Sequence, residues 1–333
     1  MDTTKLTEIA TALGVLGYDP SLRLPTPPPE LRNVPGDVYL DIVETWGDPE
    51  RTPLVASAWE NGRYFAAAHD ALRGRRARLV EWTGPTRPPG DEVAPIDLRV
   101  DHVYLVSCKY RSRITVNASP HHLFDRLLTG GYGRRGGNDW YRQGAPRAFA
   151  DLWAAAAPSV GRGDCSDPTS LDRATRKIVA GDLKSGWPDG CAEAYAALCS
   201  DVSAASAARW QEALDVAGSG AAEQMLWRLL RIGSAPYFVL GADAHEPVRR
   251  RVASPWDWRQ AYRFRSLEFA PGGGGQPTVV WRARVRRHDD EAELTVAGHV
   301  EIRWSHGRFS GPPEAKVYLD TAPADVPGYW PLR

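Results

Sequence analysis

An acidic and a basic side chain, Asp97 and Lys109, flank the most apolar strand-like run of the chain, Val103–Val106. The chain has only five lysines against 36 arginines, and a lysine at the end of an apolar strand is costly without an anionic partner. A carboxylate that binds a divalent cation, next to a lysine that orients a bound water or stabilises charge on a phosphate, would give both residues a function. The pair therefore indicates metal-assisted hydrolysis.

Two short strands joined by a turn would bring these side chains together. Residues 96–100 alternate between apolar and polar types, which predicts a strand with one buried face. Asp101 and His102 predict a turn, and the apolar run that follows predicts a central strand ending at Lys109. A salt bridge between Asp97 and Lys109 that only closes the end of a hairpin is the alternative interpretation.

At this hairpin the chain resembles the PD-(D/E)XK nuclease superfamily, which has the restriction-endonuclease-like fold. Pro95-Ile96-Asp97 stands where the superfamily has Pro-Asp, and Ser107-Cys108-Lys109 stands where it has Asp/Glu-X-Lys. The resemblance covers about residues 55–130. It implies an α/β (α+β) fold with a mixed sheet flanked by helices, and a site that holds Mg²⁺ or Mn²⁺.

The resemblance also implies a role for each residue of the hairpin. Asp97 would bind the metal, the main-chain carbonyl of Cys108 would be a further ligand, and Lys109 would position the attacking water. Ser107 departs from the motif, because a serine hydroxyl is a neutral and weaker ligand than a carboxylate. Another acidic residue is therefore expected to complete the site.

Two glutamates are candidates for this missing acid. Glu81 lies in a predicted strand over residues 77–83, and Glu60 lies in a predicted helix over residues 53–72. If the first strand neighbours the hairpin, Glu81 could approach Asp97. A solvated surface glutamate is the alternative for Glu60.

Arginine-rich segments predict contacts with nucleic acid. The loop over residues 130–137 could fold onto a phosphate backbone. Near the C-terminus, alternation places several arginines on one strand face, where they repel each other unless an anion lies there. A solvated sheet face is the alternative. The candidate nucleic-acid-binding residues are Arg134, Arg135, Arg282, Arg284, Arg286, Arg303, His306 and Arg308.

The pattern along the chain predicts four segments. Residues 1–52 are a helical and Pro-rich N-terminal segment, and residues 53–137 are the nuclease core. Residues 138–232 are a helical insertion, and residues 233–333 contain the last core strand and a β-rich substrate-binding region.

Some boundaries inside these segments follow from local pattern alone. Apolar spacing predicts separate helices over residues 189–199 and 204–216. The arginines of residues 249–251 are expected in a loop, and alternation predicts separate strands over residues 291–296 and 299–304.

Composition limits the classes of function. The formal net charge is zero, so any positive surface for nucleic acid must be local. The four cysteines show no zinc-site spacing. The first residues lack the features of a signal peptide, and no apolar run approaches 18 residues, which predicts a cytoplasmic protein without a membrane span.

The sequence thus predicts a Mg²⁺-dependent endonuclease that hydrolyses DNA phosphodiesters, in bacterial restriction or anti-phage defence by resemblance. A nucleic-acid-binding module that kept the fold but lost catalysis is the first alternative, favoured by Ser107. A subunit that depends on a helicase or ATPase partner is the second, because the chain has no nucleotide-binding loop. The sequence is also compatible with a homodimer that makes paired cuts.

Overall fold

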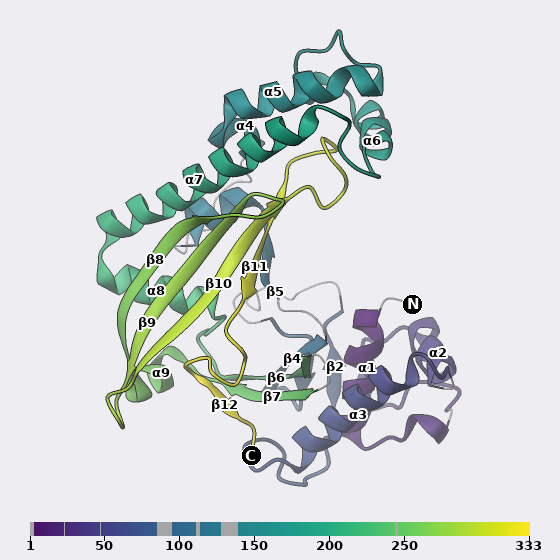
Figure 1. Ribbon diagram of the computed structural model, residues 1–333. Coiled ribbons are helices and arrows are strands. Elements are labelled where there is room, and N and C mark those ends of the chain that lie inside the picture. The colour runs from purple at the N-terminus through teal and green to yellow at the C-terminus, as the bar shows by residue number, and fades with distance from the viewer. Residues whose placement is uncertain are drawn as a thin grey trace.

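The computed structural model contains two β-sheets with helices packed against them (Figure 1). It describes residues 3–22, 24–46, 48–84, 95–110, 114–127, 139–243 and 246–333. The mixed α/β class expected from the sequence is confirmed. No helix within these ranges is long and apolar enough to cross a membrane.

Sheet A has seven strands within the described residues, in the order β1-β2-β3-β4-β6-β7-β12. They are β1 (Leu31–Arg32), β2 (Val80–Trp82), β3 (Leu98–Val100), β4 (Tyr104–Tyr110), β6 (Tyr237–Asp243), β7 (Glu246–Val252) and β12 (Tyr329–Pro331). β2, β3 and β4 form an antiparallel meander, and β6 runs parallel to β4. Parallel neighbours need a crossover connection, which the chain between β4 and β6 supplies.

The N-terminal helices lie on one side of sheet A (Figure 1): α1 (Thr3–Leu16), α2 (Gly36–Thr45) and α3 (Thr52–Ala67). Alternate residues of β3 and β4, among them Leu98 and Val106, are buried in one core with Phe65 of α3. The opposite face of the hairpin is therefore left for the polar side chains.

The turn predicted at Asp101 and His102 is confirmed. Both residues have positive φ values, 50° and 62°, as the two central residues of a hairpin turn with the favoured twist require. The Asp101 Oδ1 atom accepts hydrogen bonds from the main-chain N–H groups of Arg78 at 2.8 Å and Leu79 at 2.9 Å. An aspartate is thus used both to turn the chain and to hold the segment that leads into β2.

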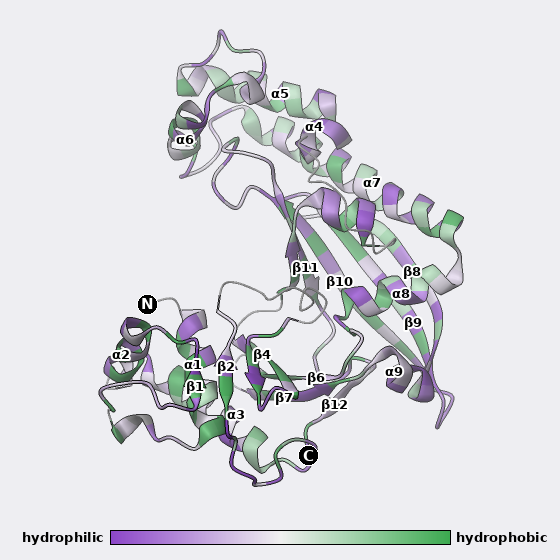
Figure 2. Ribbon diagram, turned by 180° about the vertical axis from the view of Figure 1, so that it is seen from behind, coloured by the Kyte–Doolittle hydropathy of each residue, from purple (hydrophilic) through white to green (hydrophobic). Residues whose placement is uncertain are grey.

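Sheet B has five antiparallel strands within the described residues, in the order β5-β11-β10-β9-β8. They are β5 (Ile114–Ala118), β8 (Tyr262–Gly272), β9 (Thr278–Arg287), β10 (Glu293–Arg303) and β11 (Glu314–Leu319). The helices α7 (Cys191–Ala217) and α8 (Ser219–Leu229) pack on one face. Figure 2 shows hydrophilic and hydrophobic stretches alternating along these strands, as expected for a sheet that is covered on one face.

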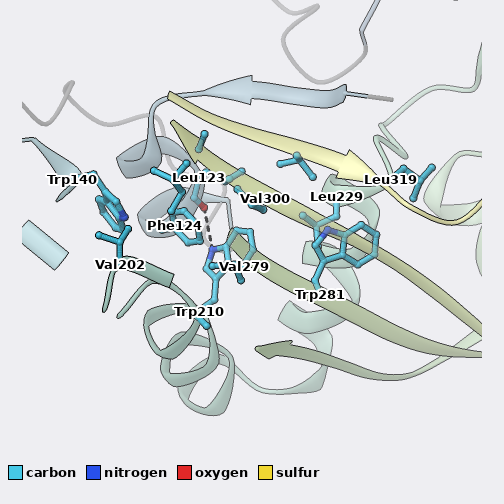
Figure 3. Packing of buried hydrophobic residues seen from close by; sticks show 14 of the residues in the cluster. Leu123, Phe124, Trp140, Val202, Trp210, Leu229, Val279, Trp281, Val300 and Leu319 are labelled. Atoms are coloured by element: carbon cyan, nitrogen blue, oxygen red, sulfur yellow. Dashed lines mark hydrogen bonds between the residues drawn. The ribbon is translucent and has the colours of Figure 1, made fainter. Parts of the chain in front are cut away.

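The core between sheet B and its helices is rich in tryptophan (Figure 3). Trp210 of α7 is fully buried, stacks at a tilt on Phe124, and donates a hydrogen bond from Nε1 to the Leu123 carbonyl oxygen at 3.2 Å. Several of the 13 tryptophans therefore belong to the core. The other helical elements are η1 (Pro20–Leu22), the π-helix η2 (His122–Arg126), α4 (Trp140–Gly144), α5 (Pro146–Ala156), η3 (Ala157–Val160), η4 (Pro168–Ser170), α6 (Arg173–Asp182) and α9 (Pro255–Ala261).

The structure corrects two boundaries in the regions that form sheet B and its helical cover. The helices predicted over residues 189–199 and 204–216 are one helix, α7, in which Ser203 Oγ donates to the Cys199 carbonyl oxygen at 2.6 Å instead of ending the helix. The strands predicted over residues 291–296 and 299–304 are one strand, β10. Gly298 lies mid-strand because the Trp281 ring occupies the space of a Cβ atom, with its nearest atom at 2.4 Å.

A third boundary changes in sheet A. Residues 249–251 lie in β7 and not in a loop. Arg249 stacks over the Tyr64 ring at 4.1 Å and Arg251 over Trp330 at 5.3 Å, so flat aromatic partners accommodate arginines inside a strand. The strands after residue 233 are divided between the two sheets, since β6, β7 and β12 complete sheet A.

Asp139 predicts a pH dependence of stability. It caps α4 by accepting a hydrogen bond from the Tyr141 N–H at 2.9 Å, and burial raises the pKa of its carboxyl to about 6. Because this pKa lies above the ordinary value of 3.8, the fold favours the neutral acid, and stability is lost as pH rises between these two values.

Asp139→Asn keeps a capping acceptor without the charge. We expect it to stabilise the protein by about 1–3 kcal/mol at pH 8, with the gain shrinking toward pH 4, in thermal unfolding measured across that range.

Candidate active site

The β3–β4 hairpin places Asp97 against the end of β4. Asp97 directly precedes β3, and its main-chain N–H donates to the Val106 carbonyl oxygen at 2.9 Å. The Asp97 Oδ2 atom accepts hydrogen bonds from the Cys108 main-chain N–H at 2.6 Å and from Ser107 Oγ at 3.1 Å. Ser107, at the position where an acid is expected, is fully buried and donates to Asp97. The carboxylate is thus fixed by charge-assisted hydrogen bonds.

Lys109 lies on the same face of sheet A as Asp97 and Ser107. It follows Ser107 by two residues in β4, and strand side chains alternate between faces. It is therefore diagonal to Asp97, a relation that separates neighbouring strand residues by about 7–8 Å. Among the described residues the Lys109 Nζ atom makes no ion pair, so a closing salt bridge to Asp97 is not formed.

Cys108 points to the other face of the sheet. Its side chain is buried in the core beneath the N-terminal helices, and burial raises the pKa of the Cys108 thiol. A neutral buried thiol is a poor ligand for a hard cation, so the main-chain carbonyl is the only metal-ligating group that Cys108 can offer at this site.

A cavity of about 80 Å³ lies beside Lys109, where sheet A meets the end of sheet B. Its walls include Lys109 and Val239 of sheet A and Thr115 and Leu319 of sheet B. The charged side chains that line it are Lys109 and Arg231, and no acidic residue of the described chain is among the lining residues. The cavity is therefore lined by two basic side chains among largely apolar ones, with the Asp97 carboxylate behind Ser107 in its wall.

Glu81 and Asp97 lie on the same face of sheet A, at different positions along its strands. Glu81 of β2 pairs with Arg99 in register, which places it diagonal to Asp97. Its Oε2 atom lies 3.1 Å from Nδ1 of His102 in the turn. Glu81 is thus on the turn side of Asp97, and Lys109 is on the other side.

Glu60 is exposed on α3. This helix packs on the opposite face of sheet A, where its Phe65 ring meets Phe238 edge to face at 5.1 Å. The structure therefore does not bring Glu60 to the face of Asp97 and Lys109. No group of three His, Cys, Asp or Glu side chains that could hold a metal occurs in the part of the chain that the structure describes.

The arginines of β9 lie on the open face of sheet B, as the alternation predicts. Arg282 and Arg284 are exposed and Arg286 is partly exposed. Arg284 pairs with Glu268 at 3.1 Å, and Arg286 pairs with Glu291. The anions next to two of these arginines are therefore glutamates of the protein itself.

The remaining candidate residues for nucleic-acid binding differ in their surroundings. Arg303 pairs with Glu301 at 3.3 Å, and His306 lies 3.4 Å from Glu314. Arg308 donates to the carbonyl oxygens of Leu183 and Gly186 and lies over the Trp187 ring, so it joins two segments of the fold. Arg134 and Arg135 lie outside the described residues.

Arg231 is the residue of this region that the sequence did not single out. It follows α8 and reaches the cavity only because the crossover returns the chain to sheet A beside β4. No local motif marks it.

Comparison of the chain with protein-family models, with curated proteins and with solved structures found no match.

Proposed function

We propose that the protein is a Mg²⁺-dependent endonuclease that hydrolyses DNA phosphodiesters at the β3–β4 hairpin. The observation that carries the proposal is the placement of the Asp97 carboxylate and the Lys109 ammonium on one face and at one end of the hairpin, beside a cavity lined by Lys109 and Arg231. A carboxylate for a metal and a cation for a phosphate are what such a reaction needs.

The donors at the site are of the type that Mg²⁺ prefers. The Asp97 carboxylate, the Ser107 hydroxyl and the Cys108 carbonyl are all oxygen donors, and Mg²⁺ keeps several waters when the protein supplies few ligands. When bound, the metal would activate a water and neutralise charge on the phosphate. With Ser107 neutral, Asp97 would be the main protein ligand, and Glu81 would hold a water from the turn side.

The chain's own groups have defined tasks in this reaction. Lys109 holds a non-bridging oxygen of the phosphate and orients the attacking water, whose oxygen forms a bond to phosphorus while one of its protons passes to solvent. The bond from phosphorus to the leaving sugar oxygen breaks, and that oxygen takes up a proton from solvent. Asp97 keeps its position during this step because two hydrogen bonds from β4 fix its carboxylate.

The test is cleavage of supercoiled plasmid DNA with Mg²⁺ or Mn²⁺. We expect the wild-type protein to cut, and Lys109→Ala and Asp97→Asn each to lose at least about 100-fold in rate, the size typical for a lost electrostatic contact in a transition state. Lys184→Ala, which removes an exposed lysine, is the matched control and should cut like the wild type. Full activity in Lys109→Ala would disprove the proposal.

A DNA-binding module without catalysis is the second candidate. It is favoured by the buried Ser107 in place of an acid and by the two hydrogen bonds that already occupy Asp97 Oδ2. Plasmid that is bound but left intact with either metal would support it. Cleavage that appears only after addition of a helicase or ATPase would instead indicate a partner-dependent subunit, the setting of some restriction and anti-phage systems.

A further inference from the structure

The cavity at the junction of the sheets has two positive charges and several hydroxyl groups in its lining. Lys109 enters from β4 and Arg231 from the segment after α8. The hydroxyl groups of Ser107, Thr115 and Thr321 also line the cavity, and each already donates its hydrogen within the protein, to Asp97 and to the carbonyl oxygens of Val317 and Ala297. The donors left for a bound anion are therefore the two basic side chains. Its volume of about 80 Å³ exceeds the roughly 10–15 Å³ that one water needs, so it can take a group of several atoms.

The backbone of Arg231 is held in a conformation that arginine disfavours. Its φ value is 58°, in the left-handed region. The Ile232 N–H donates to the Trp227 carbonyl oxygen at 2.7 Å, and the Arg231 N–H to the Arg228 carbonyl oxygen at 3.1 Å. This is the Schellman ending of a helix, in which the residue at this position is usually glycine.

Neighbouring groups fix this helix end firmly. The Tyr329 hydroxyl donates to the Leu230 carbonyl oxygen at 2.7 Å, and Tyr329 is itself buried beside Tyr237 in the cavity wall. Strained residues that are held this strongly occur preferentially at functional sites. Arg73 has the same backbone conformation outside the cavity, so the place of Arg231 in the cavity wall is what points to a use of its side chain.

We propose that Lys109 and Arg231 bind one phosphate group in this cavity, with Arg231 as a phosphate-positioning residue. That the phosphate belongs to DNA rests on the proposed function, whereas the anion site itself does not. An ammonium and a planar guanidinium on two walls suit an anion with several oxygens, because the guanidinium can contact two of them at once. The partly apolar walls strengthen these contacts by lowering the local dielectric.

The experiment compares two arginines of the same backbone type. Arg231→Gly removes the side chain and relieves the left-handed strain. Arg73→Gly does the same at an exposed position outside the cavity, where φ is 56°. Binding of a fluorescein-labelled DNA duplex is measured by anisotropy in EDTA, so that cleavage plays no part, over a series of salt concentrations. Thermal unfolding is measured for each variant with and without inorganic phosphate.

We expect Arg231→Gly to weaken DNA binding about 10-fold or more and to reduce the slope of log K against log salt by about one. Its Tm without ligand should stay equal or rise by about 1–2 °C, because glycine suits the site. Inorganic phosphate should raise the Tm of the wild type and of Arg73→Gly, but not of Arg231→Gly. Arg73→Gly should bind DNA like the wild type.

The outcomes separate this inference from the nuclease proposal. One outcome is a phosphate-dependent Tm shift that needs Arg231, in a protein that neither binds nor cuts DNA. That result would support the anion site and refute the nuclease proposal. Unchanged DNA affinity and salt slope in Arg231→Gly, or a lowered Tm with unchanged binding, would show that Arg231 is structural and overturn the inference. Absence of both DNA binding and a phosphate shift in the wild type would overturn it as well.

Discussion

Gly241→Ala is expected to destabilise the protein by about 3–5 kcal/mol, because an added methyl group has no space there. Gly241 of β6 pairs with Lys109 of β4, and a Cβ atom on it would lie 1.9 Å from the Lys109 carbonyl oxygen and 2.6 Å from the carbonyl carbon. Both atoms belong to the backbone, so the two strands would have to separate. Denaturant unfolding gives the free-energy change, and plasmid cleavage reports the position of Lys109.

Gly181→Ala is the matched control for this substitution. Gly181 lies in α6, and nothing within 4 Å would contact its Cβ atom. Since alanine is a better helix former than glycine, this variant should be about 0.5–1 kcal/mol more stable than the wild type. If Gly241→Ala unfolded at the wild-type denaturant concentration, the close approach of β4 and β6 would be refuted.

Asn61→Ala should cost about 2–4 kcal/mol, because it leaves several buried polar groups without partners. Asn61 of α3 is fully buried. Its Nδ2 atom donates to the Gly241 carbonyl oxygen at 2.8 Å and to the Tyr110 hydroxyl at 3.1 Å, and its Oδ1 atom accepts from Arg249 Nε at 2.7 Å. The loss would be measured by denaturant unfolding.

The exposed Asn117 of β5 supplies the comparison, and Asn117→Ala should change stability by less than about 0.5 kcal/mol. Asn61 and Gly241 are in contact, so their effects should not add: the double variant should differ from the sum by at least about 0.5 kcal/mol. An additive double variant would mean that the amide and the glycine act independently.

The hairpin could be predicted from the sequence because its signals are local. The alternation before Asp101, the turn residues and the apolar run after them each depend on a few neighbouring residues. The same locality explains why the open face of β9 was predicted with its three arginines. What local pattern cannot give is the partner of each charge: Glu268 approaches Arg284 only because β8 pairs with β9.

Other features depend on the sheet arrangement and were missed for that reason. β5 is five residues long and follows β4 closely, so it gave no separate signal, yet it leaves sheet A and pairs with β11 in sheet B. The place of Arg231 beside Lys109 in one cavity brings together segments that are far apart in the sequence. The roles of Glu60 and Glu81 likewise depended on which face of the sheet each would occupy.

One covalent stretch serves both walls of the cavity. β4 ends at Tyr110 in sheet A and β5 begins at Ile114 in sheet B, with three residues between them. Most surface connections tolerate insertions, because lengthening a loop costs little free energy. Here extra residues would allow the two cavity walls to separate. We therefore expect the length of this connector to vary less during evolution than its residue types.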